Sequence, residues 1–231
     1  MRLSTNAPTP KVLFDNTSPT YPMFNTAIPD QYRFDQFKRE FEEHYIRGNE
    51  TLPQFLYIWL PNDHTDEPHP KTGYAYRASY VADNDLALGR LTELLSHSPF
   101  WKDMAIFVTE DDAQDGLDHV DAHRSVLLVV SPHARHGISH VHSSMVSILK
   151  TFDAIFGIPP LNQFDAAAND LSDMFTSQPD FTPYTALPPD RRIFDPSKTR
   201  MPASVELGRS ATLDDPNVSR RNLNTQLIGQ K

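Results

Sequence analysis

The sequence contains no cysteine. Disulfide bonds, cysteine nucleophiles and thiolate-bound metals are therefore excluded, and any metal must be held by oxygen atoms and imidazole nitrogens. The chain has 30 Asp and Glu residues and 10 His residues that can supply such ligands. A metal site in this protein is thus expected to combine carboxylates with histidines.

Long apolar runs and basic clusters are also missing. No stretch of about 18 consecutive apolar residues occurs, so no membrane span is predicted. Residues 1–16 lack the apolar core of a secretory signal peptide. The formal net charge is −9 and the 21 Lys and Arg residues form no cluster, which excludes a nucleic-acid-binding footprint. Composition leaves the compartment and the oligomeric state open.

Glycine is scarce, with 8 residues against 20 prolines, and this balance favours extended connections. A chain of 231 residues is long enough for one α/β core. We expect residues 1–30 to form an extended lead-in and residues 31–187 to form the α/β domain. Residues 188–231 are expected to be a polar, proline-containing tail and a candidate for disorder.

Apolar spacing predicts three helices and three strands. Helical periodicity predicts helices over residues 30–47, 78–97 and 143–157. Short, nearly continuous apolar runs predict strands over residues 52–60, 104–110 and 125–132. Such runs are typical of strands covered on both faces, so the sheet is expected to be parallel in this region.

Two polar clusters follow predicted strands. Asp63 and His64 come directly after the first strand, and a long acidic run begins at Glu110, the last residue of the second. A strand–helix–strand unit brings the carboxyl ends of its strands to one sheet edge, where α/β proteins bind ligands. We therefore expect Asp63 and His64 to converge with Asp111 and Asp112.

The second cluster, EDDAQDGLDHVDAH (110–123), holds six carboxylates interleaved with His119 and His123. Carboxylates at this density repel one another unless solvent or a cation neutralises them. Asp and His donors suit zinc, manganese, iron or magnesium, and suit calcium less well because imidazole is a poor calcium ligand. The alternatives are a solvated acidic loop here and an Asx turn at Asp63, but the siting of both clusters at strand ends favours metal binding.

Three segments carry a resemblance to a known family. They are LPNDHT (60–65), VADNDLALGRLTELLSHSPFWKDMAIFVTEDDAQDGLDHVDAHRSVLLVVSP (81–132) and SMVSILKTFDAIFGIPPLNQFDAAANDLSDMF (144–175). They resemble the phosphoesterase family of phospholipase C-like and acid phosphatase-like proteins, within the alkaline phosphatase superfamily. The resemblance runs from about residue 20 to about residue 187.

This resemblance implies an alkaline-phosphatase-like, doubly wound α/β fold, with a mostly parallel sheet and helices on both faces. It also implies one or two divalent metals at the strand ends and a Ser or Thr nucleophile that attacks phosphorus. By the family's order of ligands, Asp63 and His64 match the first group, and Asp111 and Asp112 match the next pair. His119 is preferred for the last histidine ligand, with His123 as the alternative.

The sequence departs from the family before Leu52. Neither the family's ENxxYD-like ligand motif nor its nucleophile is found there. Further along the chain, Ser143 and Ser144 are better explained as N-capping residues of a helix than as nucleophiles. The leading interpretation is therefore a metal-dependent hydrolase of small-molecule phosphoesters, present as the C-terminal part of the family fold and incomplete at its N-terminus. The metal is expected to be zinc or manganese. The alternative is an inactive metal-binding truncation. Members of the family are commonly exported, but the compartment of this chain stays open.

Overall fold

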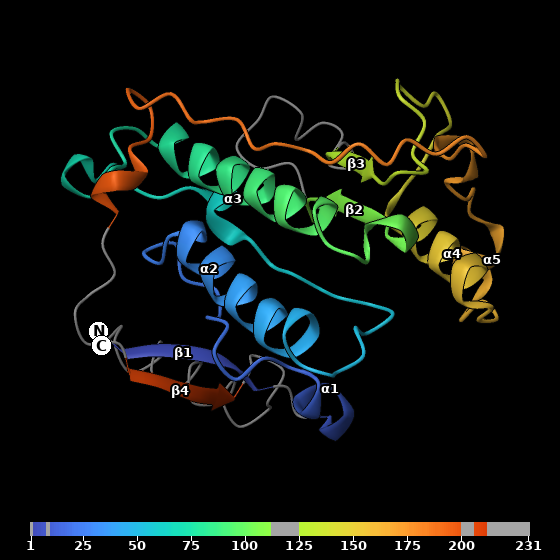
Figure 1. Cartoon of the computed structure of the whole chain (residues 1–231), viewed down its shortest axis with the longest axis horizontal. Helices are drawn as coiled ribbons and strands as arrows, with labels where there is room; N and C mark the ends of the chain where they lie inside the picture. The colour runs from blue at the N-terminus through green and yellow to red at the C-terminus, as the bar shows by residue number, and fades with distance from the viewer. Residues whose placement is uncertain (1, 8–9, 112–124, 200–205, 212–231) are drawn as a thin grey trace, which may run out of the picture. The chain divides into compact units, whose positions relative to one another are not determined.

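The computed structural model describes residues 2–7, 10–111, 125–199 and 206–211. The chain divides into two compact units. Their residues can be located in Figure 1 by the colour bar, which runs by residue number. Unit 1 comprises Met1–Leu91 together with Ala186–Lys231, and unit 2 comprises Thr92–Thr185. No helix in these described ranges is long and apolar enough to cross a membrane.

Unit 1 is built on two long helices that lie side by side, α2 (Asp30–Phe41) and α3 (Ala78–Ser96) (Figure 1). The Arg90 guanidinium of α3 lies 4.1 Å from the centre of the Phe34 ring of α2. Both helices confirm the sequence prediction. α2 continues into a π-helical turn, and the end of α3 from Thr92 onward belongs to unit 2.

The aromatic core of unit 1 joins segments that are distant in the sequence. The Tyr74 ring stacks on Tyr80 with 4.3 Å between centroids and lies 5.2 Å from Phe194. Phe194 is fully buried, although it falls within the predicted polar tail. The backbone N–H of Asp195 donates to the carbonyl of Gly73, whose φ is +96°. A Cβ atom there would lie 2.5 Å from the Asp195 carbonyl oxygen, so this close approach requires glycine.

The described residues form three further α-helices. They are α1 (Lys11–Asp15), α4 (Met145–Phe156) and α5 (Gln163–Ala167). α4 confirms the helix predicted over residues 143–157. Ser144 and Ser147 cap its start reciprocally, and Gly157 ends it in a left-handed conformation with φ of +66°. The Phe152 ring of α4 packs edge-to-face on Phe107, with 5.1 Å between centroids.

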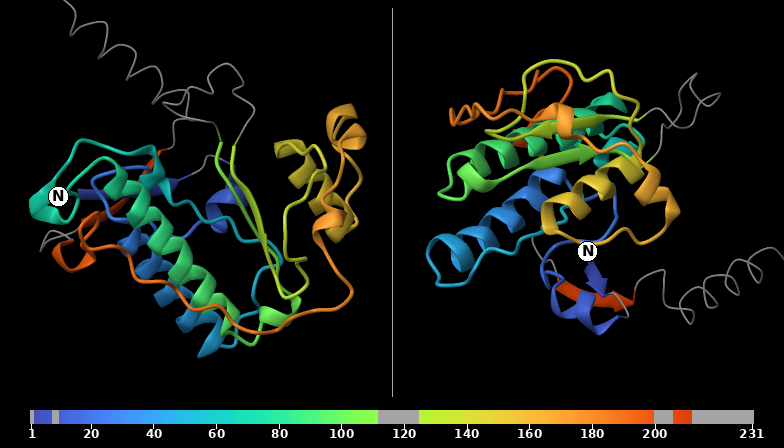
Figure 2. Two further views of the ribbon diagram at one scale, coloured as in Figure 1. Left: turned by 90° about the horizontal axis from the view of Figure 1, so that it is seen from above. Right: turned by 90° about the vertical axis from the view of Figure 1, so that its right-hand side faces the viewer.

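Strands occur as two pairs in the described part of the chain. β2 (Ile106–Thr109) pairs with β3 (Leu127–Val130) in unit 2, and this pair is antiparallel (Figure 2). Ile106 lies opposite Val130, and Thr109 lies opposite Leu127. In unit 1, β1 (Arg2–Ala7) pairs with β4 (Glu206–Ala211) in parallel.

The antiparallel pairing of β2 and β3 contradicts the parallel arrangement expected for these strands. Parallel neighbours need a crossover connection, which is usually a helix, and residues 110–126 show no helical spacing of apolar residues. The Ser125 hydroxyl donates to the Glu110 carbonyl at 2.8 Å and holds the two ends of this connection together. The doubly wound sheet of the resembled family stays a prediction.

The strand predicted over residues 52–60 is not formed. The segment is extended, but it pairs with no other strand, and the Phe55 and Tyr57 side chains are 53% and 79% exposed. Prolines at positions 53 and 61 limit the stretch that can donate hydrogen bonds to a neighbour. The prediction that this apolar run is a buried strand is therefore wrong for this structure.

A buried ion pair anchors the start of α2. Arg33 and Asp30 lie 3.1 Å apart with both side chains fully buried. The guanidinium also donates to the carbonyls of Met23, Asn25 and Ile28. One arginine therefore fixes the path of the chain that leads into the helix.

Removing this guanidinium should destabilise the protein strongly. Arg33→Met removes the donor of four hydrogen bonds, to Asp30 and to the three backbone carbonyls, so we expect the free energy of unfolding to fall by about 3–5 kcal/mol. Urea denaturation followed by far-UV circular dichroism measures this. Arg192→Met is the matched control, because its pair with Asp190 is at the surface and should contribute at most about 1 kcal/mol. Equal losses in the two variants would contradict the anchoring role.

Candidate functional site

The predicted ligands Asp63 and His64 lie on a 3-10 turn, Pro61–His64. Proline at the first position pre-sets the backbone of this turn, and the N–H of Thr65 donates to the Asn62 carbonyl to close it. Asn62 is fully buried, Asp63 is half-buried and His64 is exposed. The turn thus holds its asparagine inside the protein while its histidine faces solvent.

Asn62 is held by two buried carboxylates. Its backbone N–H donates to Asp30 Oδ2 at 3.0 Å, and its side-chain Nδ2 donates to Asp83 Oδ2 at 2.7 Å. Its Oδ1 atom is buried and has no hydrogen-bond partner among the described residues. The position of Asp63 and His64 is therefore set by contacts of the residue directly before them.

Asp83 projects from α3 and caps α2. Its carboxylate accepts the backbone N–H groups of Asp30 and Gln31, which are the first two residues of α2. The N-cap residue of that helix is Pro29, which has no side-chain acceptor, so Asp83 satisfies these donors instead. The negative charge also lies at the positive end of the helix dipole. The Tyr74 hydroxyl donates to the same carboxylate at 2.7 Å.

Burial shifts two titratable groups of this network. It raises the pKa of Asp30 to about 7, against the opposing effect of the Arg33 guanidinium, and the nearby Asp83 carboxylate raises it further. Burial likewise raises the pKa of the Tyr74 hydroxyl, and its hydrogen bond to Asp83 acts in the same direction. Loss of solvent around Asp30, together with the second carboxylate nearby, therefore outweighs the Arg33 guanidinium.

Thr65 directly follows His64 and is strained. Its φ of 62° and ψ of 167° lie in a region that is essentially reserved for glycine. It is the one non-glycine residue with positive φ in the described ranges. Strain of this kind is retained where the surroundings over-determine the backbone, and it concentrates at functional sites.

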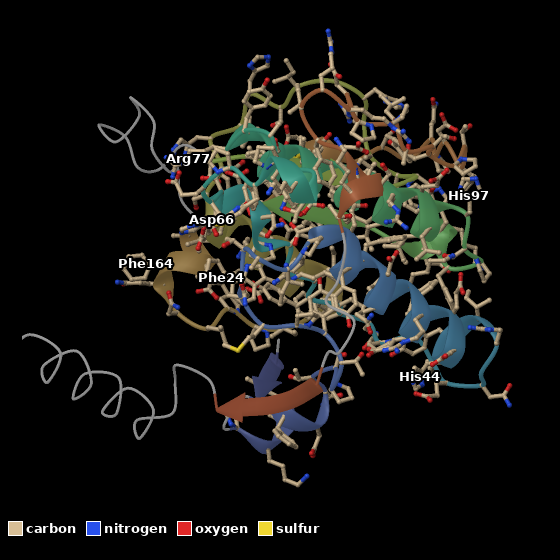
Figure 3. All side chains as sticks on the ribbon, turned by 90° about the vertical axis from the view of Figure 1, so that its left-hand side faces the viewer. Phe24, His44, Asp66, Arg77, His97 and Phe164 are labelled. Atoms are coloured by element: carbon tan, nitrogen blue, oxygen red, sulfur yellow. The ribbon has the colours of Figure 1, made fainter. Side chains whose placement is uncertain are left out.

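Aromatic side chains flank the exposed histidine. The Phe24 ring lies edge-to-face with His64 at 5.3 Å and is 5.6 Å from Trp59. Figure 3 shows Phe24 on the same side of the structure as Asp66. The Thr26 hydroxyl donates to Asp66 at 2.6 Å, which ties the chain after the turn to the Phe24 segment.

The remaining predicted ligands belong to unit 2 or fall outside the described residues. Asp111 is exposed, two residues after β2, in unit 2, whereas Asp63 and His64 belong to unit 1. Asp112, His119 and His123 lie outside the described residues. The described part of the chain contains no group of three or more His, Asp or Glu side chains that could hold a metal ion. The convergence of the two clusters therefore stays a prediction.

The donor chemistry of the turn nevertheless fits a divalent metal. One carboxylate and one exposed imidazole on adjacent residues supply the oxygen and nitrogen ligands that zinc and manganese take. The sequence reading missed the supporting residues Asp30, Asn62 and Asp83. A signal for Asp83 was available, since it shares the helical spacing of the buried residues Tyr80, Ala87 and Leu91.

No family model, curated protein or solved structure matches the chain. The family resemblance therefore rests on the sequence segments alone.

Relieving the strain at Thr65 should stabilise the protein. For Thr65→Gly we expect the free energy of unfolding to rise by about 1 kcal/mol, because about 1–3 kcal/mol of strain exceeds the entropic cost of glycine, about 0.5–1 kcal/mol. Urea denaturation measures the change. Thr51→Gly, at an exposed position without positive φ, should lower stability, and a loss in both variants would argue against strain.

The raised pKa of Asp30 predicts a pH dependence. The folded protein should hold a proton on Asp30 between about pH 4 and pH 7 that the unfolded chain has released. The contribution of Asp30 to stability is then greatest near pH 4 and falls as the pH rises to 7. The difference in free energy of unfolding between wild type and Asp30→Asn should shrink over this window. Urea denaturation at several pH values tests this, and a difference that grows with pH would contradict it.

Proposed function

We propose that the chain is a metal-dependent hydrolase of phosphoester bonds, with Asp63, His64, Asp111, Asp112 and His119 as metal ligands and His123 as the alternative last histidine. The observation that carries the proposal is the way in which the turn Pro61–His64 and the following Thr65 are held. A buried polar network holds Asn62, and a strained residue follows an exposed histidine. A solvated Asx turn needs neither of these features.

The residues of the turn have distinct tasks in this proposal. Asp63 and His64 bind the metal from adjacent positions, and Asn62 keeps them in place through Asp30 and Asp83. Zinc or manganese suits these donors best. Iron would also take both donors, while magnesium or calcium would use the carboxylates more than the imidazole. When bound, the metal supplies positive charge that binds phosphoryl oxygens and stabilises the leaving oxygen. No described residue is assigned as the nucleophile.

The fold belongs to the same proposal. We infer a doubly wound, mostly parallel sheet with helices on both faces. The support is the apolar and largely exposed segment 53–60, which forms no strand in this structure and leaves an apolar surface that other elements would cover. A run of this composition is stable in water only when other elements cover it.

Hydrolysis of a chromogenic phosphodiester tests the function. The purified full chain, loaded with zinc or manganese, should release p-nitrophenolate from bis(p-nitrophenyl) phosphate, and Asp111→Asn should abolish the release by removing a metal ligand. Asp103→Asn is the matched control, because it makes the same change at an exposed carboxylate of the same unit and should leave the rate unchanged.

The alternative is a metal-binding protein without catalytic activity, favoured by the missing nucleophile. Metal binding that depends on Asp111, without any release of p-nitrophenolate, would favour this alternative. A chain that binds neither zinc nor manganese would contradict both functions.

A further inference from the structure

Asn84 is the residue of α3 that touches a proposed ligand directly. Its side-chain Nδ2 lies 3.4 Å from Asp63 Oδ1, which is a long hydrogen bond. The same amide donates to the Leu60 carbonyl at 2.7 Å and lies 3.2 Å from Asp30 Oδ2, so its two hydrogens are shared among three acceptors. Asn84 therefore contacts the chain on both sides of Asn62.

Asp83 and Asn84 act on the turn as a pair. They are consecutive on α3. Asp83 accepts a hydrogen bond from the side-chain amide of Asn62, while Asn84 donates to the Leu60 carbonyl and to Asp63 Oδ1. Asp83 and Asn84 of one 19-residue helix therefore form hydrogen bonds with the chain at Leu60, Asn62 and Asp63. Side chains carried by a helix hold their geometry more firmly than side chains of a loop.

A hydrogen bond to one oxygen of a carboxylate restricts rotation of the whole group. Donation from Asn84 to Asp63 Oδ1 therefore limits the directions in which this carboxylate can present its lone pairs. Partners of this kind orient metal ligands, and their loss typically weakens metal binding by about 10–100-fold.

We propose that Asn84 is a positioning residue for the metal ligand Asp63. Its amide sets the orientation of the Asp63 carboxylate, and its bond to the Leu60 carbonyl fixes the approach of the chain to the turn. This inference rests on the proposed metal-binding function. A purely structural role would rest on the bonds to Leu60 and Asp30, and would leave metal geometry untouched once the protein is folded.

Cobalt binding to the full chain separates these roles. Calorimetry gives the affinity for Co²⁺, and the visible absorption of bound Co²⁺ reports the geometry of its ligands. We expect Asn84→Ala to weaken Co²⁺ binding by about 10–100-fold and to alter the absorption spectrum. Far-UV circular dichroism and urea denaturation confirm that each variant is folded under the conditions of the titration.

Two further variants make the test specific. Asn84→Leu keeps a side chain of similar size but has no donor, so it should reproduce the loss seen for Asn84→Ala, and it serves in its place if the alanine variant does not fold. Asp85→Ala changes the next residue of the same helix, which is exposed, and should keep the affinity within about twofold.

The possible failures are distinguishable. If the wild-type chain binds Co²⁺ and the folded Asn84 variants match it in affinity and spectrum, the positioning role is overturned while the proposed function stands. If Asn84→Leu alone retains wild-type binding, side-chain volume rather than hydrogen bonding matters, and the inference is likewise overturned. A wild-type chain that does not bind Co²⁺ would overturn both.

Discussion

The arrangement of unit 1 depends on the hydrogen bonds that the buried carboxylate of Asp83 accepts. It is fully buried and accepts hydrogen bonds from the start of α2, from Asn62 and from the Tyr74 hydroxyl. A buried charge is tolerated only when donors replace the water that it has lost. These donors come from three separate segments, so the charge forces the segments into one arrangement. The burial of Asp83 is thus the reason why α2, α3 and the Asn62 turn share a single geometry.

Rigidity of the turn follows from this arrangement. Apolar side chains can repack in several ways at similar free energy, whereas a satisfied polar network is stable in only one geometry. Because Asn62 is fixed on one side, the backbone at Thr65 can be held in a conformation that threonine rarely adopts. The same support places an exposed histidine and a half-buried carboxylate on adjacent residues at the surface.

Local patterns predicted the long helices well, because apolar spacing in residues 78–97 and 143–157 reflects contacts made within a few turns. Pairing of strands depends on contacts that are remote in sequence, and here the prediction of parallel β2 and β3 was wrong. In the candidate site, Asp63 and His64 were predicted as ligands from their type and position, and their ligand role stays a prediction. The spacing of Asp83 on α3 marked it as buried, but its role was missed because the start of α2, which it caps, is remote in sequence.

The extended segment 53–61 has a consequence for the behaviour of the chain before folding is complete. It reads PQFLYIWLP and contains no charged residue. Natural proteins protect edges of this kind with lysines, bulges or covering elements, since an unpaired apolar backbone is a template for strands of other chains. Here the two flanking prolines are the only such protection within the segment. Because this stretch is also largely exposed in the folded structure, the yield of monomeric protein depends on how often two chains collide there.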